Sequence, residues 1–299
     1  MFWIHPQYRA MLAAATADSY EAVLKLPARD HFVEKQGRST GRYTIAGSNE
    51  SVSVYLKKYF RMPWWQRLLM PTGRFPGPRE LANLQRVAAL GIAVPEPVVA
   101  GADRNRHCKS LLAVRELEGY VPLHEFIPAR FLRPEAASQR ALRRQLAHRL
   151  ADIVRTLHAA NLYHLDLYLC HFFIREGDEK GSGVVCRNGP QGASHRGGRV
   201  SHKRLPTPFC PPAGFELVLI DLMRLKHSRL SRWRIKDLAQ LLFSSDLPGI
   251  TRTDRFRFFK QYLGLRRLDA TARRLLRRVQ RKAALYHRHN DTLARRAAA

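Results

Sequence analysis

Four charged side chains in the sequence have the types and settings that phosphoryl transfer requires. Lys57 ends an alternating apolar stretch typical of a β-strand, and Glu80 lies in the helical pattern that follows. Asp166 follows a long amphipathic pattern, and Asp221 ends a second short strand. A lysine held by a glutamate can bind phosphates, a carboxylate at a strand end can bind Mg²⁺, and a loop carboxylate can take the proton of a hydroxyl. Together they predict a nucleotide-dependent phosphotransferase.

The order of these residues matches the signature of the protein kinases. His171 stands five residues after Asp166, where protein kinases carry a metal-binding asparagine. We therefore predict His171 as a second metal ligand, although nitrogen suits Mg²⁺ less well than oxygen. Leu165 replaces the arginine that reads a phosphorylated activation loop, and Asp237 follows Asp221 by only 16 residues. Activation by loop phosphorylation is therefore not expected, and the acceptor is predicted not to be a protein.

Further residues are predicted to support the reaction or to bind the nucleotide. His164 is expected to pack beneath the catalytic loop, and Asp237 to accept hydrogen bonds from that loop's N–H groups. Glu116 and Leu117 fall where a linker between two lobes would offer backbone groups to adenine. A glycine-containing loop between two strands is predicted to cover the phosphates: Gly37, Arg38, Ser39, Thr40 and Gly41.

Simpler interpretations exist for several of these residues. Lys58 is adjacent to Lys57, and only one of the two can point to the cleft because strand side chains alternate. Glu80 could be an ordinary solvated glutamate of an amphipathic helix, and the two aspartates could be surface carboxylates. The loop that starts at Gly37 does not match the spacing G-x-G-x-x-G.

The pattern of apolar residues predicts a mainly β region followed by a mainly helical one. Residues 8–24 predict one helix, and residues 31–59 predict three antiparallel strands. Further predicted elements are a helix at 78–90, a strand at 111–117, a helix at 136–160, strands at 172–174 and 217–220, and helices to the end, the last from 269. Residues 177–214 contain 8 Gly and 5 Pro and predict a disordered insertion.

Three motifs resemble one known family. They are the pattern Asp-x-Tyr-x-Cys-His-Phe at 166–172, the run Ile-Asp-Leu-Met-Arg at 220–224 and the run Lys-Asp-Leu-Ala-Gln-Leu at 236–241. Over roughly residues 30–265 the chain is similar to the lipopolysaccharide inner-core sugar kinases, the WaaP-like heptose and Kdo kinases. The resemblance implies ATP and Mg²⁺ as cofactors. It also implies transfer of the γ-phosphate to a sugar hydroxyl of a lipid-linked core oligosaccharide at the cytoplasmic membrane face.

The resemblance also implies an α+β, bilobal, protein-kinase-like fold with a small antiparallel-β N-lobe, one key helix in it and a larger helical C-lobe. The expected division is a helical extension at 1–30, the N-lobe at 31–118, the C-lobe at 119–265 with its insertion, and a basic helical tail at 266–299. The oligomeric state is not predicted.

The charge of the chain predicts a polyanionic partner. There are 52 Lys and Arg against 24 Asp and Glu, and residues 251–299 alone carry 15 against 3. We expect this tail to bind an anionic membrane surface, its alternative being a solvated helical face. Trp64, Trp65, Leu68 and Leu69 predict core packing or, alternatively, a membrane-facing patch. No specific nucleic acid is expected, because no nucleic-acid-binding motif is present.

The expected location is the cytoplasm, peripheral to the membrane, because no apolar run approaches the roughly 18 residues of a membrane span. Three rival functions stay open: a kinase of the same fold with a soluble acceptor, a non-enzymatic basic binding module, and a degenerate kinase that binds nucleotide without turnover.

Overall fold

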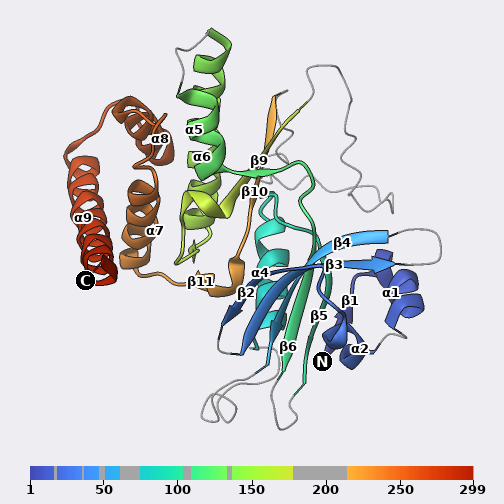
Figure 1. Cartoon of the computed structure of the whole chain (residues 1–299). Coiled ribbons are helices and arrows are strands. Elements are labelled where there is room, and N and C mark those ends of the chain that lie inside the picture. Colours follow the sequence, from blue (N-terminus) through green and yellow to red (C-terminus); the bar gives the residue numbers. More distant parts are fainter. Residues whose placement is uncertain are drawn as a thin grey trace, which may run out of the picture.

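A computed structural model describes residues 1–16, 19–35, 37–46, 51–60, 75–103, 109–132, 137–177 and 214–298. The elements form two lobes (Figure 1). The smaller lobe contains β1 (Phe2–Ile4), η1 (Pro6–Tyr8), α1 (Arg9–Thr16), α2 (Tyr20–Lys25), β2 (Asp30–Lys35), β3 (Arg38–Ala46), β4 (Ser51–Tyr59), α4 (Pro76–Ala88), β5 (Pro97–Ala102) and β6 (Ser110–Arg115).

The larger lobe follows directly in the chain. It contains β7 (Val121–Pro122), α5 (Leu123–Phe131), α6 (Ala137–Ala159), β8 (Leu162–Tyr163), η3 (Leu169–His171), β9 (Phe172–Glu176), β10 (Phe215–Leu219), η4 (Leu222–Arg224), β11 (Lys226–His227), α7 (Ser231–Ser244), α8 (Arg252–Leu263) and α9 (Ala270–Ala298).

The smaller lobe is built on one antiparallel sheet in the order β1-β5-β6-β4-β3-β2. The three strands predicted between residues 31 and 59 are its β2, β3 and β4. The single helix predicted at 8–24 is wrong, because α1 ends at Thr16 and Ser19 caps the start of α2 by accepting the Ala22 N–H at 3.4 Å. The strand β1 was not predicted; it covers the free edge of β5.

The side chains of β4 alternate between two environments. Val54 and Leu56 are fully buried in one core cluster with Leu12 of α1 and Val23 of α2. Lys58 shares this face by strand parity, whereas Lys57 points to the opposite face, where α4 packs. The alternation of the strand therefore separates the two adjacent lysines.

Helix α4 packs against the sheet through a narrow stripe. Leu81, Leu84 and Val87 are buried at helical spacing. Gly77 allows a very close approach, since a Cβ at this position would lie 2.0 Å from the Leu111 carbonyl oxygen of β6. This contact fixes the first turn of α4 and so sets the height of the helix above the sheet.

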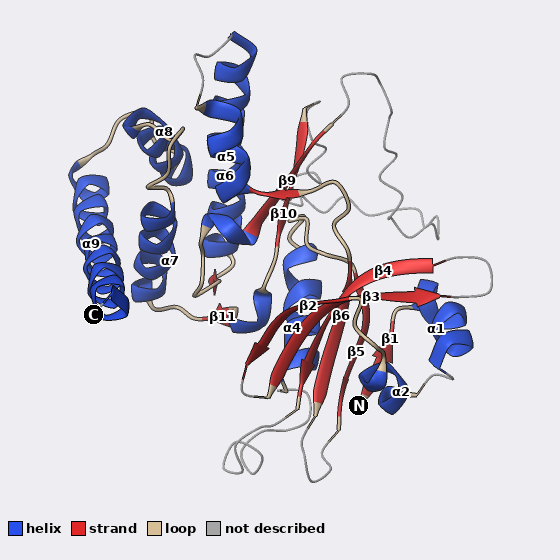
Figure 2. Ribbon diagram, viewed as in Figure 1, coloured by secondary structure: helices blue, strands red, loops and turns tan. Residues whose placement is uncertain are grey.

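The larger lobe is centred on α6, which matches the helix predicted at 136–160. Its Leu150, Val154 and Leu157 lie in the main core cluster. Figure 2 shows the helices grouped on the side of this lobe away from the main sheet, with α7 and α9 side by side. Buried Ala272, Val279 and Ala283 lie along α9. Among the described residues, no helix has the length and apolar character that a membrane span needs.

Candidate active site

Lys57, Glu80 and Asp221 meet between the lobes. The Lys57 ammonium donates to Oε1 of Glu80 at 2.6 Å and to Oδ1 of Asp221 at 2.9 Å. The neighbouring Lys58 instead donates to the Leu26 carbonyl oxygen at 2.8 Å, on the far side of the sheet. Of the two candidate lysines, Lys57 is therefore the one that the structure places with the predicted glutamate and aspartate.

Electrostatics favour the charged forms of Lys57 and Asp221, whereas burial raises the pKa of Glu80. Burial opposes the charge on Lys57, but Glu80 and Asp221 outweigh burial and raise the pKa of the ammonium. Burial also opposes ionisation of Asp221, yet Lys57 outweighs it and holds the pKa of this carboxyl below its ordinary value. A charged lysine therefore stands beside a charged aspartate at neutral pH.

Side-chain hydrogen bonds from α7 hold the loop that carries Asp166. The carboxylate of Asp237 is fully buried and accepts the His164 N–H at 2.8 Å and the Leu165 N–H at 2.9 Å. The His164 ring lies 3.0 Å from the Ile220 carbonyl oxygen, and burial lowers the pKa of this histidine. The loop is thereby tied both to α7 and to the strand end that precedes Asp221.

Two residues that sequence reasoning missed complete this support. Lys236 Nζ and Gln240 Nε2 both donate to the Leu165 carbonyl oxygen, at 2.6 Å and 3.1 Å. Gln240 Oε1 also accepts the Leu167 N–H at 3.2 Å. The signal for Gln240 was its position three residues after Asp237, which places both side chains on one face of α7.

The His171 ring lies between the backbone of Asp166 and the side chain of Asp221. Its Nδ1 lies 2.6 Å from the Asp166 carbonyl oxygen, and its Nε2 lies 3.9 Å from Oδ2 of Asp221. A carbonyl oxygen only accepts, so Nδ1 carries a proton and Nε2 faces Asp221. Burial disfavours the imidazolium, but the Cys170 side chain and the Asp166 carbonyl more than compensate and raise the pKa of His171.

The predicted metal ligands fit a divalent cation shared with phosphates. Among the described residues, no group of three or more His, Cys, Asp or Glu side chains is arranged as a metal site. Mg²⁺ usually takes one or two protein carboxylates and completes its shell with phosphates and water. Asp221 supplies such a carboxylate, its backbone in the left-handed region with φ 58°. His171 is the neighbouring nitrogen.

The predicted phosphate loop is shorter than expected. Lys35 of β2 pairs directly with Arg38 of β3, so of the five predicted residues only Gly37, with φ 82°, lies in the turn. Ser39, Thr40 and Gly41 are strand residues of β3, which corrects the predicted extent of the loop. The Arg38 charge helps to lower the pKa of Asp221, so this arginine lies close to the cluster.

The two predicted linker residues follow the end of β6. The Glu116 N–H donates to the Ser53 carbonyl oxygen at 2.9 Å. Its carboxylate accepts two bonds from Arg42 of β3, from Nε at 2.8 Å and from Nη2 at 2.7 Å. Glu116 is thus fixed to the sheet, and Leu117 is the next residue of the linker.

Comparison with known proteins identifies the family. A model of the lipopolysaccharide kinase (Kdo/WaaP) family matches residues 24–185 and 200–262, which is most of the chain. The chain belongs to this family. The resemblance inferred from the three motifs is therefore confirmed.

Relatives of this lipopolysaccharide kinase are core heptose kinases. The lipopolysaccharide core heptose(I) kinase WaaP of Pseudomonas aeruginosa is 30% identical over 284 residues, covering 91% of each chain. WaaP of Escherichia coli K12 is 30% identical over 147 residues, 48% of this chain and 44% of that protein. The lipopolysaccharide kinase is accordingly a phosphotransferase with an alcohol acceptor.

The fold prediction is confirmed as well. A solved structure described as WaaP in complex with acyl carrier protein matches 98% of this lipopolysaccharide kinase and 99% of that chain, with a TM-score of 0.64 and 24% identity. The α+β, bilobal, kinase-like arrangement is therefore that of the family. The predicted patch at Trp64, Trp65, Leu68 and Leu69 and the predicted insertion, save its end residues 177 and 214, lie outside the described residues.

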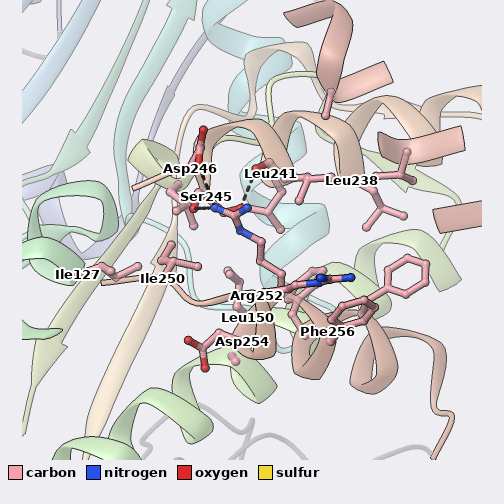
Figure 3. A pocket seen from close by; sticks show the side chains of 18 of the residues that line it. Ile127, Leu150, Leu238, Leu241, Ser245, Asp246, Ile250, Arg252, Asp254 and Phe256 are labelled. Atoms are coloured by element: carbon pink, nitrogen blue, oxygen red, sulfur yellow. Dashed lines mark hydrogen bonds and ion pairs between the residues drawn. The ribbon is translucent and has the colours of Figure 1, made fainter. Parts of the chain in front are cut away.

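A separate apolar cavity lies within the helical lobe of the lipopolysaccharide kinase. Its volume is about 480 Å³, and it is lined by residues of α5, α6, α7, α8 and α9. Figure 3 shows Ile127, Leu150 and Leu238 around it, and the charged side chains of Asp246, Arg252 and Asp254 also line it. Arg255 donates there to the Ser245 carbonyl oxygen at 2.8 Å. The residues predicted for catalysis do not line this cavity.

Proposed function

We propose that this lipopolysaccharide kinase transfers the γ-phosphate of ATP, with Mg²⁺, to a heptose or Kdo hydroxyl of the lipid-linked inner-core oligosaccharide. The observation that carries the proposal is the cluster between the lobes. Lys57 joins Glu80 to Asp221, and His171 joins Asp221 to the loop of Asp166. These residues come from both lobes, as expected of a site that clamps a nucleotide against an acceptor.

The residues divide the work of the reaction. Lys57, oriented by Glu80, binds phosphate oxygens of ATP, and Asp221 with the adjacent His171 would hold the metal. Mg²⁺ supplies charge neutralisation on the phosphates when bound. Asp166 orients the acceptor hydroxyl. As the acceptor oxygen bonds to the γ-phosphorus, the bond from this phosphorus to the β–γ bridging oxygen breaks, ADP leaves, and the acceptor proton passes to Asp166.

Other predicted residues bind the nucleotide through the backbone or position the loop. We assign the turn at Gly37 and the following Arg38 to the phosphates, together with the start of β3. Glu116 and Leu117 offer a backbone carbonyl and a backbone N–H to adenine. The Glu116 side chain takes no part, because Arg42 binds its carboxylate. Asp237 and His164 act as supports of the catalytic loop rather than as reacting groups.

The catalytic assignment is tested by transfer of labelled phosphate from ATP to extracted lipopolysaccharide core. We expect Asp166→Asn and Asp221→Asn each to lower kcat by about 10²- to 10⁴-fold. Asp246→Asn is the matched control, because Asp246 is an exposed aspartate with its side chain 64% accessible, just after α7. Unchanged transfer in both site variants would refute the assignment.

We further propose that α9 holds the enzyme on the inner face of the cytoplasmic membrane. Exposed arginines follow one another along this helix: Arg273, Arg274, Arg277, Arg278, Arg281 and Arg288. Each basic residue near an anionic leaflet contributes about 1 kcal/mol. The enzyme should sediment with phosphatidylglycerol-containing vesicles, less so as salt is added, and not with pure phosphatidylcholine vesicles. Indifference to both would instead favour a kinase of a soluble acceptor.

An acyl carrier protein is a second proposed partner. The solved WaaP chain that covers nearly the whole of this one is described in complex with such a protein. The apolar cavity among α5–α9 is a site into which an acyl chain would fit, because its lining is mainly aliphatic and aromatic. Binding should therefore be tighter for an acylated carrier than for the carrier without its acyl group. Equal binding of both forms would contradict use of the cavity.

A further inference from the structure

The carboxylate of the proposed base, Asp166, forms an ion pair with an arginine to which the proposed reaction assigns no role. Arg224, in η4, donates from Nη1 to Oδ2 of Asp166 at 2.7 Å. The arginine side chain is 53% exposed, whereas that of Asp166 is 23% exposed. Arg224 therefore lies on the open side of Asp166, toward solvent rather than toward the core.

The guanidinium has unused binding capacity. It presents five N–H donors in a planar fork, and within the described ranges its hydrogen bond to Asp166 is its one side-chain contact of that kind. A carboxylate or phosphate can accept two parallel bonds from such a fork, which a lysine cannot supply. The pair with Asp166 is half-exposed, so an incoming anion can compete for it.

The surroundings of Arg224 favour an anion. Lys236 lies beside the same loop through its bond to the Leu165 carbonyl oxygen, and Lys282 of α9 approaches from a third element. Burial, then the charge of Arg224 and, more weakly, that of Lys282, lower the pKa of Lys236. Cations from η4, α7 and α9 thus lie around the loop of Asp166, whereas the Asp237 carboxylate is buried beneath this loop.

We infer that Arg224 is the specificity residue for the acceptor: it binds an anionic group, a carboxylate or a phosphate, that the acceptor sugar carries near its reacting hydroxyl. In the free enzyme Arg224 is paired with Asp166. The acceptor's anionic group takes the place of Asp166 as the partner of Arg224 and leaves Oδ2 of Asp166 free for the acceptor proton. This inference rests on the proposed function and names the chemistry of its substrate.

The inference predicts a defect in acceptor binding rather than in turnover. An arginine that binds the acceptor equally in the ground state and the transition state changes KM without changing kcat. Arg224→Gln should raise the KM for the intact acceptor by about 10- to 100-fold, the range for hydrogen bonds to a charged group, with kcat nearly unchanged. Arg224→Lys should recover part of the loss, since it restores charge but not the fork.

The experiment compares the wild type, Arg224→Gln and Arg224→Lys on three acceptors: intact core oligosaccharide, carboxyl-reduced core and dephosphorylated core. Arg229→Gln is the matched control, because Arg229 is an exposed arginine five residues away with the same charge. If the wild type and Arg224→Gln have equal KM values for the carboxyl-reduced core, the anionic group is a carboxylate. If their KM values are equal for the dephosphorylated core, the anionic group is a phosphate.

Three results would overturn the inference: an unchanged KM in Arg224→Gln, a KM defect that persists on both neutralised acceptors, or an equal defect in Arg229→Gln. A wild type that phosphorylates none of the three acceptors would instead refute the proposed function, and this inference with it.

Discussion

Replacing Lys57 with methionine should cost stability as well as activity. The ammonium is the partner of Glu80, whose side chain is only 3% exposed, and of Asp221, at 32%. Removing one member of a buried ion pair leaves an uncompensated charge and typically costs about 3–5 kcal/mol. We therefore expect Lys57→Met to lower the free energy of unfolding by roughly 3 kcal/mol, since Glu80 can relieve part of the penalty by taking up a proton.

A second substitution separates this stability effect from catalysis. In Lys57→Met/Glu80→Leu both buried charges are gone, and such replacement of a whole pair by apolar side chains is often neutral or stabilising. The double variant should regain most of the unfolding free energy yet still transfer no phosphate, because it lacks the ammonium that we propose binds the phosphates. Urea unfolding followed by circular dichroism measures the first quantity, and labelled-ATP transfer measures the second.

The adjacent lysine is the control for strand parity. Lys58→Met removes an ammonium that contacts the Leu26 carbonyl oxygen and lies 4.5 Å from the centre of the Tyr43 ring, away from the cleft. Its phosphate transfer should equal that of the wild type. Two results would contradict these roles: Lys58→Met abolishes transfer while Lys57→Met keeps it, or Lys57→Met unfolds at the same urea concentration as the wild type.

Three further predictions follow from single contacts. Burial lowers the pKa of Lys58 to about 8, from an ordinary value of 10.5. Between these two pH values the unfolded state binds more protons than the folded state, so the free energy of unfolding should rise with pH. Urea titrations should show this rise in the wild type and not in Lys58→Met. Asp237→Asn leaves one buried N–H of the loop that carries Asp166 facing an amide N–H, so it should lower the free energy of unfolding by about 1–3 kcal/mol in thermal or urea unfolding. It should also change kcat more than it changes the KM for ATP. The control Asp246→Asn should change neither stability nor activity. Gly77→Ala should lower both the melting temperature and the rate of phosphate transfer. The added Cβ would lie 2.0 Å from the Leu111 carbonyl oxygen and would force α4, with Glu80, away from the sheet. A fully active and equally stable variant would contradict this prediction.

Local pattern predicted the elements of the site better than their exact limits. Alternation in β4 and helical spacing in α4 placed Lys57 and Glu80 on the right elements, but strand parity alone left Lys57 and Lys58 equivalent. The difference lies in what covers each face of the sheet, which depends on distant residues. The predicted loop at Gly37 was too long because the register of β2 and β3 is set by pairing between strands.

Contacts between distant segments were the least predictable part. Arg224 and Asp166 are 58 residues apart, and nothing in the local sequence around either residue indicates their ion pair. The start of α2 as a separate helix likewise depends on the capping hydrogen bond of Ser19, which competes with continuation of a single helix. In both cases the sequence supplies the functional groups, and the fold decides which of them meet.

Non-glycine residues in the left-handed region lie in or near the segments that carry the proposed site residues. Three non-glycine residues have positive φ: Asn161 at 56°, Leu165 at 68° and Asp221 at 58°, among the described residues. Asparagine and aspartate adopt this conformation more readily than most residues, but for leucine the cost is about 1–3 kcal/mol. Leu165 directly precedes Asp166, and Asp221 is itself in the cluster.

The compensating contacts lie in opposite lobes. The Leu165 peptide is held by α7, through the Asp237 carboxylate and the Lys236 ammonium, whereas the segment at Asp221 is held by the smaller lobe. There Lys57 binds its side chain, and Asn83 Nδ2 of α4 donates to the Leu222 carbonyl oxygen at 2.8 Å. The turn at Asp221 is therefore held by contacts to both β4 and α4 of the smaller lobe. The packing of the two lobes and the position of the proposed metal ligand therefore depend on the same contacts, so Lys57, Glu80 and Asp221 are positioned together.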